Sequence, residues 1–346
     1  MTKVSVIGLF CAGREVSDGQ SIKTRIITDE LEKALGAQCV RRIDTYGWKK
    51  HPVRLFSDSI RAVLQSENVI FMTDAGGIKI FPWLLLGANL FCRHKLHYVV
   101  VGAWLVSYLE NQPLIAAFLR RFDTLFVETT VLKEGLERLG FRNVRLMPNC
   151  KPLEILPKEQ LDVELAEPYR FCTFSRVMQE KGIEDAIDAV RAVNERFGRT
   201  VCTLDIYGPV DEKQKEWFDA LQADFSGEIH YRGIIPYTES VDTIKACNAL
   251  LFPTRFYTEG IPGTIIDAYA AGVPVICARW ESFSDVVDEG ITGWSYAFGE
   301  SEELTKLVYE AVTAPDILRN MKENCLKKAN DYLPEQVMDI LLRELS

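Results

Sequence analysis

The sequence predicts an α/β protein of two domains, each built on a parallel sheet covered by helices. Three observations predict this class. Apolar, β-branched runs alternate with helical stretches along the whole chain, which is the order typical of parallel sheets. A segment with three prolines, 148–158, interrupts the alternation near the middle and is expected to be a linker. The 346 residues suffice for two domains of about 150–175 residues each.

The first half is expected to contain six strands, separated by helices of which 20–35 and 132–139 are the clearest. These strands are 4–10, 39–43, 68–73, 97–102, 124–128 and 144–147. Five strands are expected after the linker: 170–174, 200–207, 228–232, 249–252 and 275–278. Ligands of such sheets bind at the carboxyl ends of the strands. We therefore expect the site at strand-end loops that face a cleft between the domains.

Composition indicates a soluble cytoplasmic protein. The run 3–10 is better explained as a first buried strand than as the apolar core of a secretory leader. The longest apolar run, 80–92, has thirteen residues and contains Pro82, so it falls short of the ~20 residues that a membrane-spanning helix needs. The nine cysteines form no CxxC pair, which is typical of buried thiols in a reducing compartment.

Charged residues are unevenly distributed between the two halves of the chain. Residues 1–150 hold 20 Lys and Arg against 14 Asp and Glu, whereas residues 151–346 hold 20 against 35. The acidic half argues against a nucleic-acid partner, while the basic half would be attracted to an anionic surface. Aromatic residues near lysines, Trp48 beside Lys49 and those of 81–95, suit a peripheral membrane contact. The alternative is that these basic side chains only solvate helix faces.

Two strand-end loops could bind phosphate. The loop 11–20 places Gly19 at the start of a helix, where free backbone N–H groups bind anions. Its glycine spacing does not fit G-x-G-x-x-G, so a nicotinamide site is not supported. The loop 174–183 places Arg176 and Lys181 around a turn, where two cations could neutralise a diphosphate leaving group. The alternative is that both are solvated surface charges. A further buried strand ends in Gly208 and Pro209.

The stretch 258–276 is expected to be a loop, a helix and a strand. Glu259 lies in the Gly/Pro-rich loop, Pro262 suits the first helical position, and Gly272 is placed to end the helix. Asp267 lies within that helix, and two carboxylates on such a scaffold suit sugar or ribose hydroxyls. The alternative is that Glu259 caps the helix and Asp267 is a solvated polar residue.

These motifs together resemble a known family. Residues 176–182 (RVMQEKG), the Tyr207–Gly208 pair, and Glu259-x7-Asp267 with Gly-Ile-Pro inside are similar to the signature of retaining family 4 glycosyltransferases of the GT-B fold. The resemblance covers most of the C-terminal half and, more loosely, the N-terminal half, including 18–21 and 129–149. It extends to glycosyltransferases of bacterial capsule and exopolysaccharide clusters. It implies a Rossmann-like acceptor domain over 1–152, a Rossmann-like nucleotide-sugar domain over 153–332, and a last helix, 333–346, that packs on the first domain.

The resemblance also implies roles for individual residues. Arg176 and Lys181 would hold the diphosphate, and Glu259 would contact hydroxyls of the transferred sugar. Asp267, where the family usually has Glu, would bind the ribose. The remaining implied contacts are backbone groups that bind the nucleotide sugar: Gly19 near the diphosphate, Gly208 without a more specific role, Gly233 and Ile234 at the base, and Gly260, Ile261, Pro262, Gly263 and Thr264 at sugar and phosphate. The His or Asp that many members carry after the fourth strand has no counterpart here, because Gly102 and Ala103 stand there.

The expected function is thus transfer of a sugar from a nucleotide-diphosphate sugar, with a UDP-sugar as first choice, to a saccharide acceptor that is expected to be lipid-linked. No D-x-D triad and no His/Cys cluster is present in the sequence, so no cofactor or obligatory metal is expected. Three alternatives stay open: a sugar-nucleotide epimerase, a phosphorylase, and a catalytically silent partner subunit that binds a nucleotide sugar. A dehydrogenase is the weakest alternative.

Overall fold

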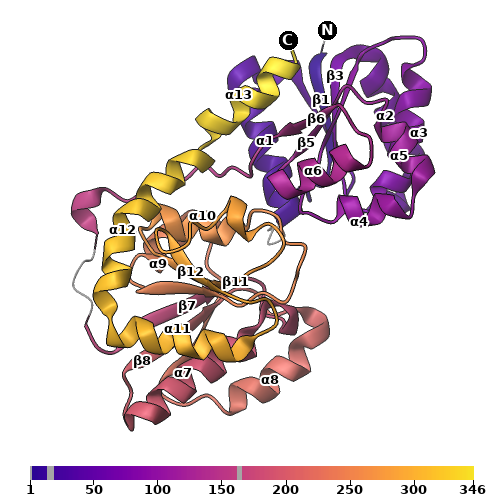
Figure 1. Ribbon diagram of the computed structural model, residues 1–346. Coiled ribbons are helices and arrows are strands. Elements are labelled where there is room, and N and C mark those ends of the chain that lie inside the picture. The colour runs from indigo at the N-terminus through magenta and orange to yellow at the C-terminus, as the bar shows by residue number, and fades with distance from the viewer. Residues whose placement is uncertain (1, 14–18, 162–165) are drawn as a thin grey trace. The chain divides into compact units, whose positions relative to one another are not determined.

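The computed structural model describes residues 2–13, 19–161 and 166–346. The chain divides into two compact units (Figure 1). Unit 1 consists of Met1–Pro152 together with Pro334–Ser346, and unit 2 is Leu153–Leu333. The predicted linker segment lies at this division.

Unit 1 is built on a parallel sheet of six strands in the order β2-β1-β3-β4-β5-β6. Val4 lies opposite both Val40 and Asn68, which fixes the register of the first three strands. All six strands predicted in this half are present, but the fourth is displaced toward the N-terminus. The strands are β1 (Thr2–Gly8), β2 (Val40–Asp44), β3 (Ser66–Met72), β4 (Lys95–Val99), β5 (Thr124–Val127) and β6 (Val144–Leu146).

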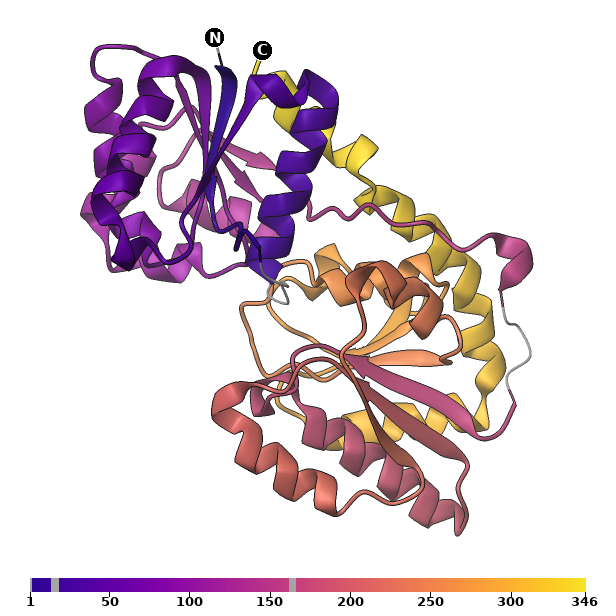
Figure 2. The ribbon, with the colours of Figure 1, turned by 180° about the vertical axis from the view of Figure 1, so that it is seen from behind.

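Helices cover both faces of this sheet. One face packs against five helices: α2 (Pro52–Gln65), α3 (Phe81–Asn89), α4 (Leu105–Glu110), α5 (Pro113–Leu119) and α6 (Thr130–Arg138). The other face packs against α1 (Gly19–Leu35) and the C-terminal helix α13 (Pro334–Glu344). Figure 2 shows these two helices on one side of the sheet. Val337, Met338 and Leu341 of α13 are buried in this core, so the end of the chain is part of unit 1.

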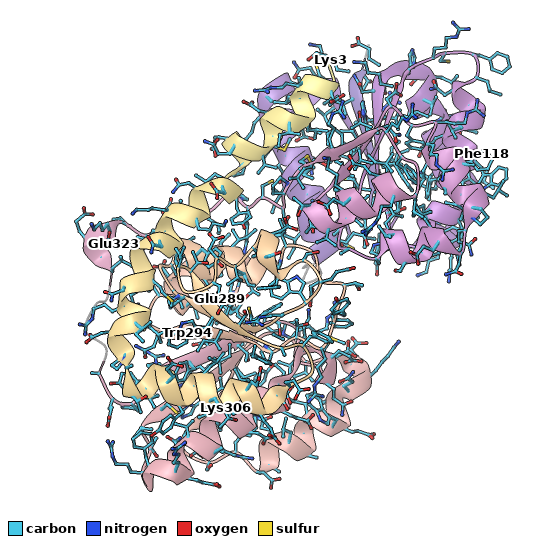
Figure 3. All side chains as sticks on the ribbon, in the orientation of Figure 1. Lys3, Phe118, Glu289, Trp294, Lys306 and Glu323 are labelled. Atoms are coloured by element: carbon cyan, nitrogen blue, oxygen red, sulfur yellow. The ribbon has the colours of Figure 1, made fainter. Side chains whose placement is uncertain are left out.

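Unit 2 repeats the architecture with the order β12-β11-β10-β7-β8-β9. The sequence predicted five of its strands and missed β12 (Gly293–Tyr296), an edge strand without β-branched residues, on which Trp294 lies (Figure 3). The other strands are β7 (Tyr169–Phe174), β8 (Cys202–Tyr207), β9 (Ile229–Gly233), β10 (Ala249–Phe252) and β11 (Val275–Ala278).

The helices of unit 2 also form two layers. Side chains of α7 (Ile183–Phe197), α8 (Lys215–Ala223) and α11 (Ser301–Thr313) enter one core. Side chains of α9 (Ser240–Ile244) and α10 (Gly263–Ala270) enter the other, and α12 (Pro315–Ala329) contributes to both. Short 3-10 segments complete the chain: η1 (Ala37–Cys39), η2 (Trp48–Lys50), η3 (Gly77–Lys79), η4 (Lys158–Gln160), η5 (Gln179–Lys181), η6 (Glu212–Gln214), η7 (Tyr237–Glu239), η8 (Phe283–Asp285) and η9 (Asn330–Tyr332).

Within the described residues, every helix is too short or too polar to cross a membrane. The nine cysteines are all free thiols; seven are buried, and Cys39 and Cys92 are partly exposed.

Candidate functional site

The candidate site is the carboxyl edge of the unit 2 sheet. Because β7, β8, β9 and β10 are all parallel, the loops that follow them emerge at one edge. These loops carry the predicted residues Arg176 and Lys181 after β7, Gly208 at the end of β8, Ile234 after β9, and the segment 259–264 after β10. The fold therefore brings together residues that are up to 88 positions apart in the sequence.

The loops after β7 and β10 are packed against each other. Gly182 adopts a left-handed conformation (φ 67°), and a Cβ added there would lie 2.0 Å from the backbone oxygen of Pro253. Only glycine permits this approach. The amide of Arg255 donates to the Glu180 carbonyl at 2.8 Å, and the Arg255 guanidinium binds both carboxylate oxygens of Asp185 at 2.8 and 3.0 Å. The two loops are thus tied together by backbone and side-chain contacts.

This packing places Lys181 beside Glu259. Lys181 Nζ forms an ion pair with Glu259 Oε1, and Thr254 Oγ1 donates to the same oxygen at 2.9 Å. The ammonium also lies 4.9 Å from the ring centroid of Phe256 and 5.8 Å from that of Phe252, within cation–π range. The side chains of Lys181 and Glu259 are only 19% and 16% exposed. The alternatives of a solvated lysine and a helix-capping glutamate are therefore wrong for this structure.

Arg176 is less constrained than Lys181. Its side chain is 41% exposed, and Nη1 lies 3.6 Å from Asp211 Oδ2, which is longer than a hydrogen bond. The guanidinium can therefore turn most of its five N–H donors toward a ligand.

Gly208 holds the ends of β7, β8 and β9 close together. Its φ is 130°, and an added Cβ would lie 1.8 Å from the Ser175 backbone oxygen. Its amide donates to the Gly233 carbonyl at 2.8 Å, and its carbonyl accepts from the Tyr231 hydroxyl at 2.9 Å. Ile234 follows with 66% of its surface exposed. The predicted base-binding segment is therefore open to solvent and fixed at its start.

The start of α10 presents free donors. The helix begins at Gly263, with Pro262 as the N-cap residue and no side-chain cap, one residue later than predicted. Among the described residues, the amides of Ile265 and Ile266 donate to Pro262, whereas those of Gly263 and Thr264 have no backbone acceptor. Thr264 Oγ1 is buried without a hydrogen-bond partner in the described part of the chain. Unpaired N–H groups at a helix start attract anions.

Comparison with known proteins identifies this unit. Residues 159–328 match the family model of glycosyl transferases group 1. They form a glycosyl transferases group 1 domain. A biosynthetic glycosyltransferase for amylovoran, AmsK of Erwinia amylovora, is 23% identical over 148 residues, which cover 42% of this chain and 36% of AmsK. The lipopolysaccharide core glycosyltransferase LpsE of Rhizobium meliloti is 22% identical over 226 residues, covering 63% of this chain and 62% of LpsE. The chain thus matches less than two thirds of either relative.

Solved structures confirm the predicted fold. HepE of Anabaena has a TM-score of 0.76 at 14% identity, with 99% of this chain and 98% of HepE covered. Sucrose-phosphate synthase of Thermosynechococcus elongatus has a TM-score of 0.77 at 16% identity, with 100% and 99% covered. The pair of six-stranded parallel sheets is the GT-B arrangement of these proteins.

Two predicted site residues lie outside this constellation of loops. Asp267 belongs to α10 of the group 1 domain, but it is only 2% exposed, so it is not a solvated polar residue and its carboxylate is not presented at the surface. Gly19 begins α1 in unit 1, and the preceding loop residues 14–18, Asp18 among them, lie outside the described residues. Their predicted roles toward ribose and diphosphate stay predictions.

Sequence reasoning missed three residues of the candidate site. Thr254 holds Glu259, Phe256 lies over Lys181, and Arg255 ties the two loops. A signal was present, because these residues directly follow Pro253 at the end of a buried strand, where ligands of parallel sheets bind. A cavity of about 240 Å³ adjoins this segment and is lined by residues that include Thr254, Arg255 and Tyr296.

Proposed function

We propose that this chain is a retaining, metal-independent glycosyltransferase that moves a sugar from a nucleotide-diphosphate sugar to a saccharide acceptor in surface polysaccharide synthesis. The observation that carries the proposal is the Lys181–Glu259 pair, together with two amides at the start of α10 that have no backbone acceptor among the described residues, within a group 1 domain. This arrangement places a cation, a carboxylate and N–H groups at the carboxyl edge of one sheet, which suits a ligand with both phosphate and hydroxyl groups.

In the proposed reaction, the bond between the anomeric carbon and the diphosphate oxygen breaks while the acceptor oxygen bonds to the same face of that carbon. The transition state has oxocarbenium character, as in other glycosyl transfers. Arg176, Lys181 and the α10 amides stabilise the negative charge that develops on the leaving diphosphate. Glu259, already oriented by Thr254, accepts hydrogen bonds from hydroxyls of the transferred sugar. The acceptor proton passes to a diphosphate oxygen.

We expect metal independence because two basic side chains, Arg176 and Lys181, are available to the diphosphate, whose charge Mg²⁺ neutralises elsewhere. Within the described residues no group of three or more His, Cys, Asp or Glu side chains is placed to hold a metal ion. Turnover should therefore survive EDTA. Loss of turnover that Mg²⁺ or Mn²⁺ restores would contradict this part of the proposal.

The donor and acceptor classes rest on the names of similar proteins. HepE was solved with UDP and with UDP-glucose, which supports a UDP-sugar as the first donor to test. AmsK and LpsE are named for amylovoran and lipopolysaccharide core synthesis, which supports a surface saccharide, lipid-linked in this proposal, as acceptor. Such an acceptor would place the protein in the cytoplasm at the inner face of the plasma membrane. Exposed apolar residues after α3, Leu90 at 65% and Phe91 at 90%, support peripheral contact with an anionic bilayer.

Kinetics of two variants test the assignment. A thermal-shift screen with UDP-, GDP- and ADP-sugars first identifies the donor, since a ligand at 100 times its Kd stabilises the fold by about 2.7 kcal/mol. With that donor, Lys181→Ala and Arg176→Ala should each lower the kcat of donor hydrolysis by about 10² or more, as loss of an oxyanion donor does. Lys306→Ala, an exposed lysine of α11 (Figure 3), is the matched control and should keep full turnover.

Three results would contradict the proposal. Near-wild-type turnover in both variants would show that Arg176 and Lys181 do not contribute to catalysis. Background hydrolysis with every nucleotide sugar would favour a silent partner subunit. Release of sugar phosphate from an oligosaccharide in the presence of inorganic phosphate would favour a phosphorylase. For an active enzyme, NMR of the product anomer decides between retention and inversion.

A further inference from the structure

Unit 1 contains a groove that the proposed donor chemistry does not use. Its volume is about 810 Å³, and it runs between the edge strand β2 and the helix α2. Binding sites for small ligands have volumes of about 300–1,000 Å³, so the groove is large enough for several sugar rings. The lining residues are Arg41, Arg42, Ile43, Asp44, Tyr46, Gly47, Trp48, His51, Arg54, Leu55, Asp58, Arg61 and Gln65.

One face of α2 forms the first wall. Arg54, Asp58, Arg61 and Gln65 follow one another at spacings of four, three and four residues, which places them in a single stripe along the helix. The strand β2 forms the second wall, with Arg41 and Arg42. As the edge strand, β2 pairs with β1 alone among the described strands.

The groove carries positive charge that its own acids do not neutralise. Arg54 and Arg61 share one carboxylate, Asp58, at 3.7 and 3.5 Å, and their side chains are 83% and 64% exposed. Arg41 donates to the neutral amide oxygen of Gln65 at 3.1 Å. By contrast, Arg42 is neutralised by Asp29 and Glu32 at 2.6 and 2.7 Å. Three guanidinium groups of the groove, those of Arg41, Arg54 and Arg61, are therefore balanced by a single carboxylate, that of Asp58.

The other acid of the groove is already occupied. The Asp44 carboxylate accepts hydrogen bonds from the backbone amides of Phe10, Ala12 and Tyr46 at 2.9, 3.0 and 2.9 Å. It thereby fixes the loop that follows β2. That loop carries two aromatic rings into the groove, Tyr46 at 45% and Trp48 at 37% exposure.

We propose that this groove binds an anionic saccharide, namely a part of the acceptor chain that carries carboxylate groups. The inference rests on the proposed glycosyltransferase function, because it assigns the groove to that enzyme's acceptor. Guanidinium groups bind carboxylates through paired, charge-assisted hydrogen bonds, and exposed Trp and Tyr rings offer apolar faces against which sugar rings pack. A concave site suits a chain better than the flat surface of a bilayer.

Binding of a defined oligosaccharide tests the proposal. The probe is tetragalacturonate, with maltotetraose as the neutral counterpart of equal length, titrated calorimetrically into the 346-residue chain. We expect saturable, salt-sensitive binding of the acidic probe and at least about tenfold weaker binding, or about 1.4 kcal/mol, to the double variant Arg54→Gln/Arg61→Gln. Trp48→Ala should weaken binding as well. These side chains are exposed, so the variants should fold, and their melting temperatures verify this.

The matched control removes two arginines elsewhere in unit 1. Arg138 at the end of α6 and Arg142 beyond it are both exposed and do not line the groove. The variant Arg138→Gln/Arg142→Gln should bind the acidic probe like the wild type. Equal loss in both double variants would show attraction by net charge alone and would overturn the proposal. So would equal binding of maltotetraose, or no binding of the acidic probe at millimolar concentration.

A second readout separates this inference from the proposed function. Donor hydrolysis by the wild type is the readout of the proposed function, and binding of the acidic probe is the readout of the groove. Saturable binding of the acidic probe without any donor hydrolysis would support saccharide binding in the groove and contradict the proposed enzymatic function. Donor hydrolysis without probe binding would support the enzymatic function and contradict saccharide binding in the groove. Flotation with anionic vesicles that is lost in the groove variant, without probe binding, would reassign the groove to lipid headgroups.

Discussion

The close approach of two strand ends at Gly208 gives a prediction about activity. In Gly208→Ala, the new Cβ would lie 1.8 Å from the Ser175 oxygen, where ordinary contact begins at 3.4 Å. The obstacle is backbone, so the ends of β7 and β8 must separate by about 1.6 Å, and a misplacement of about 1 Å can cost about 10² in rate. Arg176, next to Ser175, would move with the strand end. We therefore expect the kcat of donor hydrolysis to fall by about 10² or more.

The matched control is Gly198→Ala at the end of α7. Gly198 also has a positive φ, 64°, but a Cβ there meets no atom within 4 Å. This variant therefore carries backbone strain, about 1–2 kcal/mol, without a steric clash and away from the carboxyl edge of the sheet. Its melting temperature should drop by a few degrees while kcat is retained. The reasoning is refuted if Gly208→Ala, folded by circular dichroism, hydrolyses the donor as fast as Gly198→Ala does.

Two further predictions concern single side chains. Thr254→Val removes the hydroxyl that donates to Glu259 at 2.9 Å, so kcat should fall about fivefold for the loss of about 1 kcal/mol. The control is Thr243→Val, whose hydroxyl donates to the Glu239 carbonyl at 2.8 Å; it should leave kcat unchanged. Equal kcat in the two variants would contradict the role of Thr254. His97 is fully buried, and burial lowers its pKa from 6.5 to about 4. The unfolded chain takes up this proton below pH 6.5 and the folded chain only near pH 4, so the free energy of unfolding should decrease as pH falls through this window, by about 1.4 kcal/mol per pH unit. Urea unfolding midpoints between pH 7 and 5 measure this decrease in the free energy of unfolding, which should be smaller in His97→Gln. An identical decrease in the variant would exclude His97 as the cause.

Much of the fold can be predicted from local sequence patterns. Eleven of the twelve strands were predicted, because buried parallel strands are continuous apolar runs that can be recognised without a partner. The exception, β12, has the sequence Gly-Trp-Ser-Tyr, which is neither long nor β-branched. It is a strand because it pairs with β11, with Trp294 opposite Ile276. That pairing is a tertiary contact, and no local pattern predicts it.

Three residues of the candidate site could also be predicted from the sequence, because Arg176, Lys181 and Glu259 follow buried strands and ligands bind at strand ends. The contact between Lys181 and Glu259 could not be predicted. Lys181 and Glu259 are 78 residues apart and meet only because Gly182 allows the β7 loop to lie against Pro253. The burial of Asp267, to 2% exposure, was likewise decided by the packing of α10 against its neighbours.

The sequence alone thus determined which chemical groups the group 1 domain possesses, because residue type and strand order are local properties. Tertiary structure decided which groups pair, which are buried and which stay open. The same holds for the groove of unit 1, which Arg54 and Arg61 line together with Trp48 and Arg41 only through the packing of α2 beside β2. Distance and desolvation set the strength of each interaction, and both depend on how segments far apart in the chain are packed.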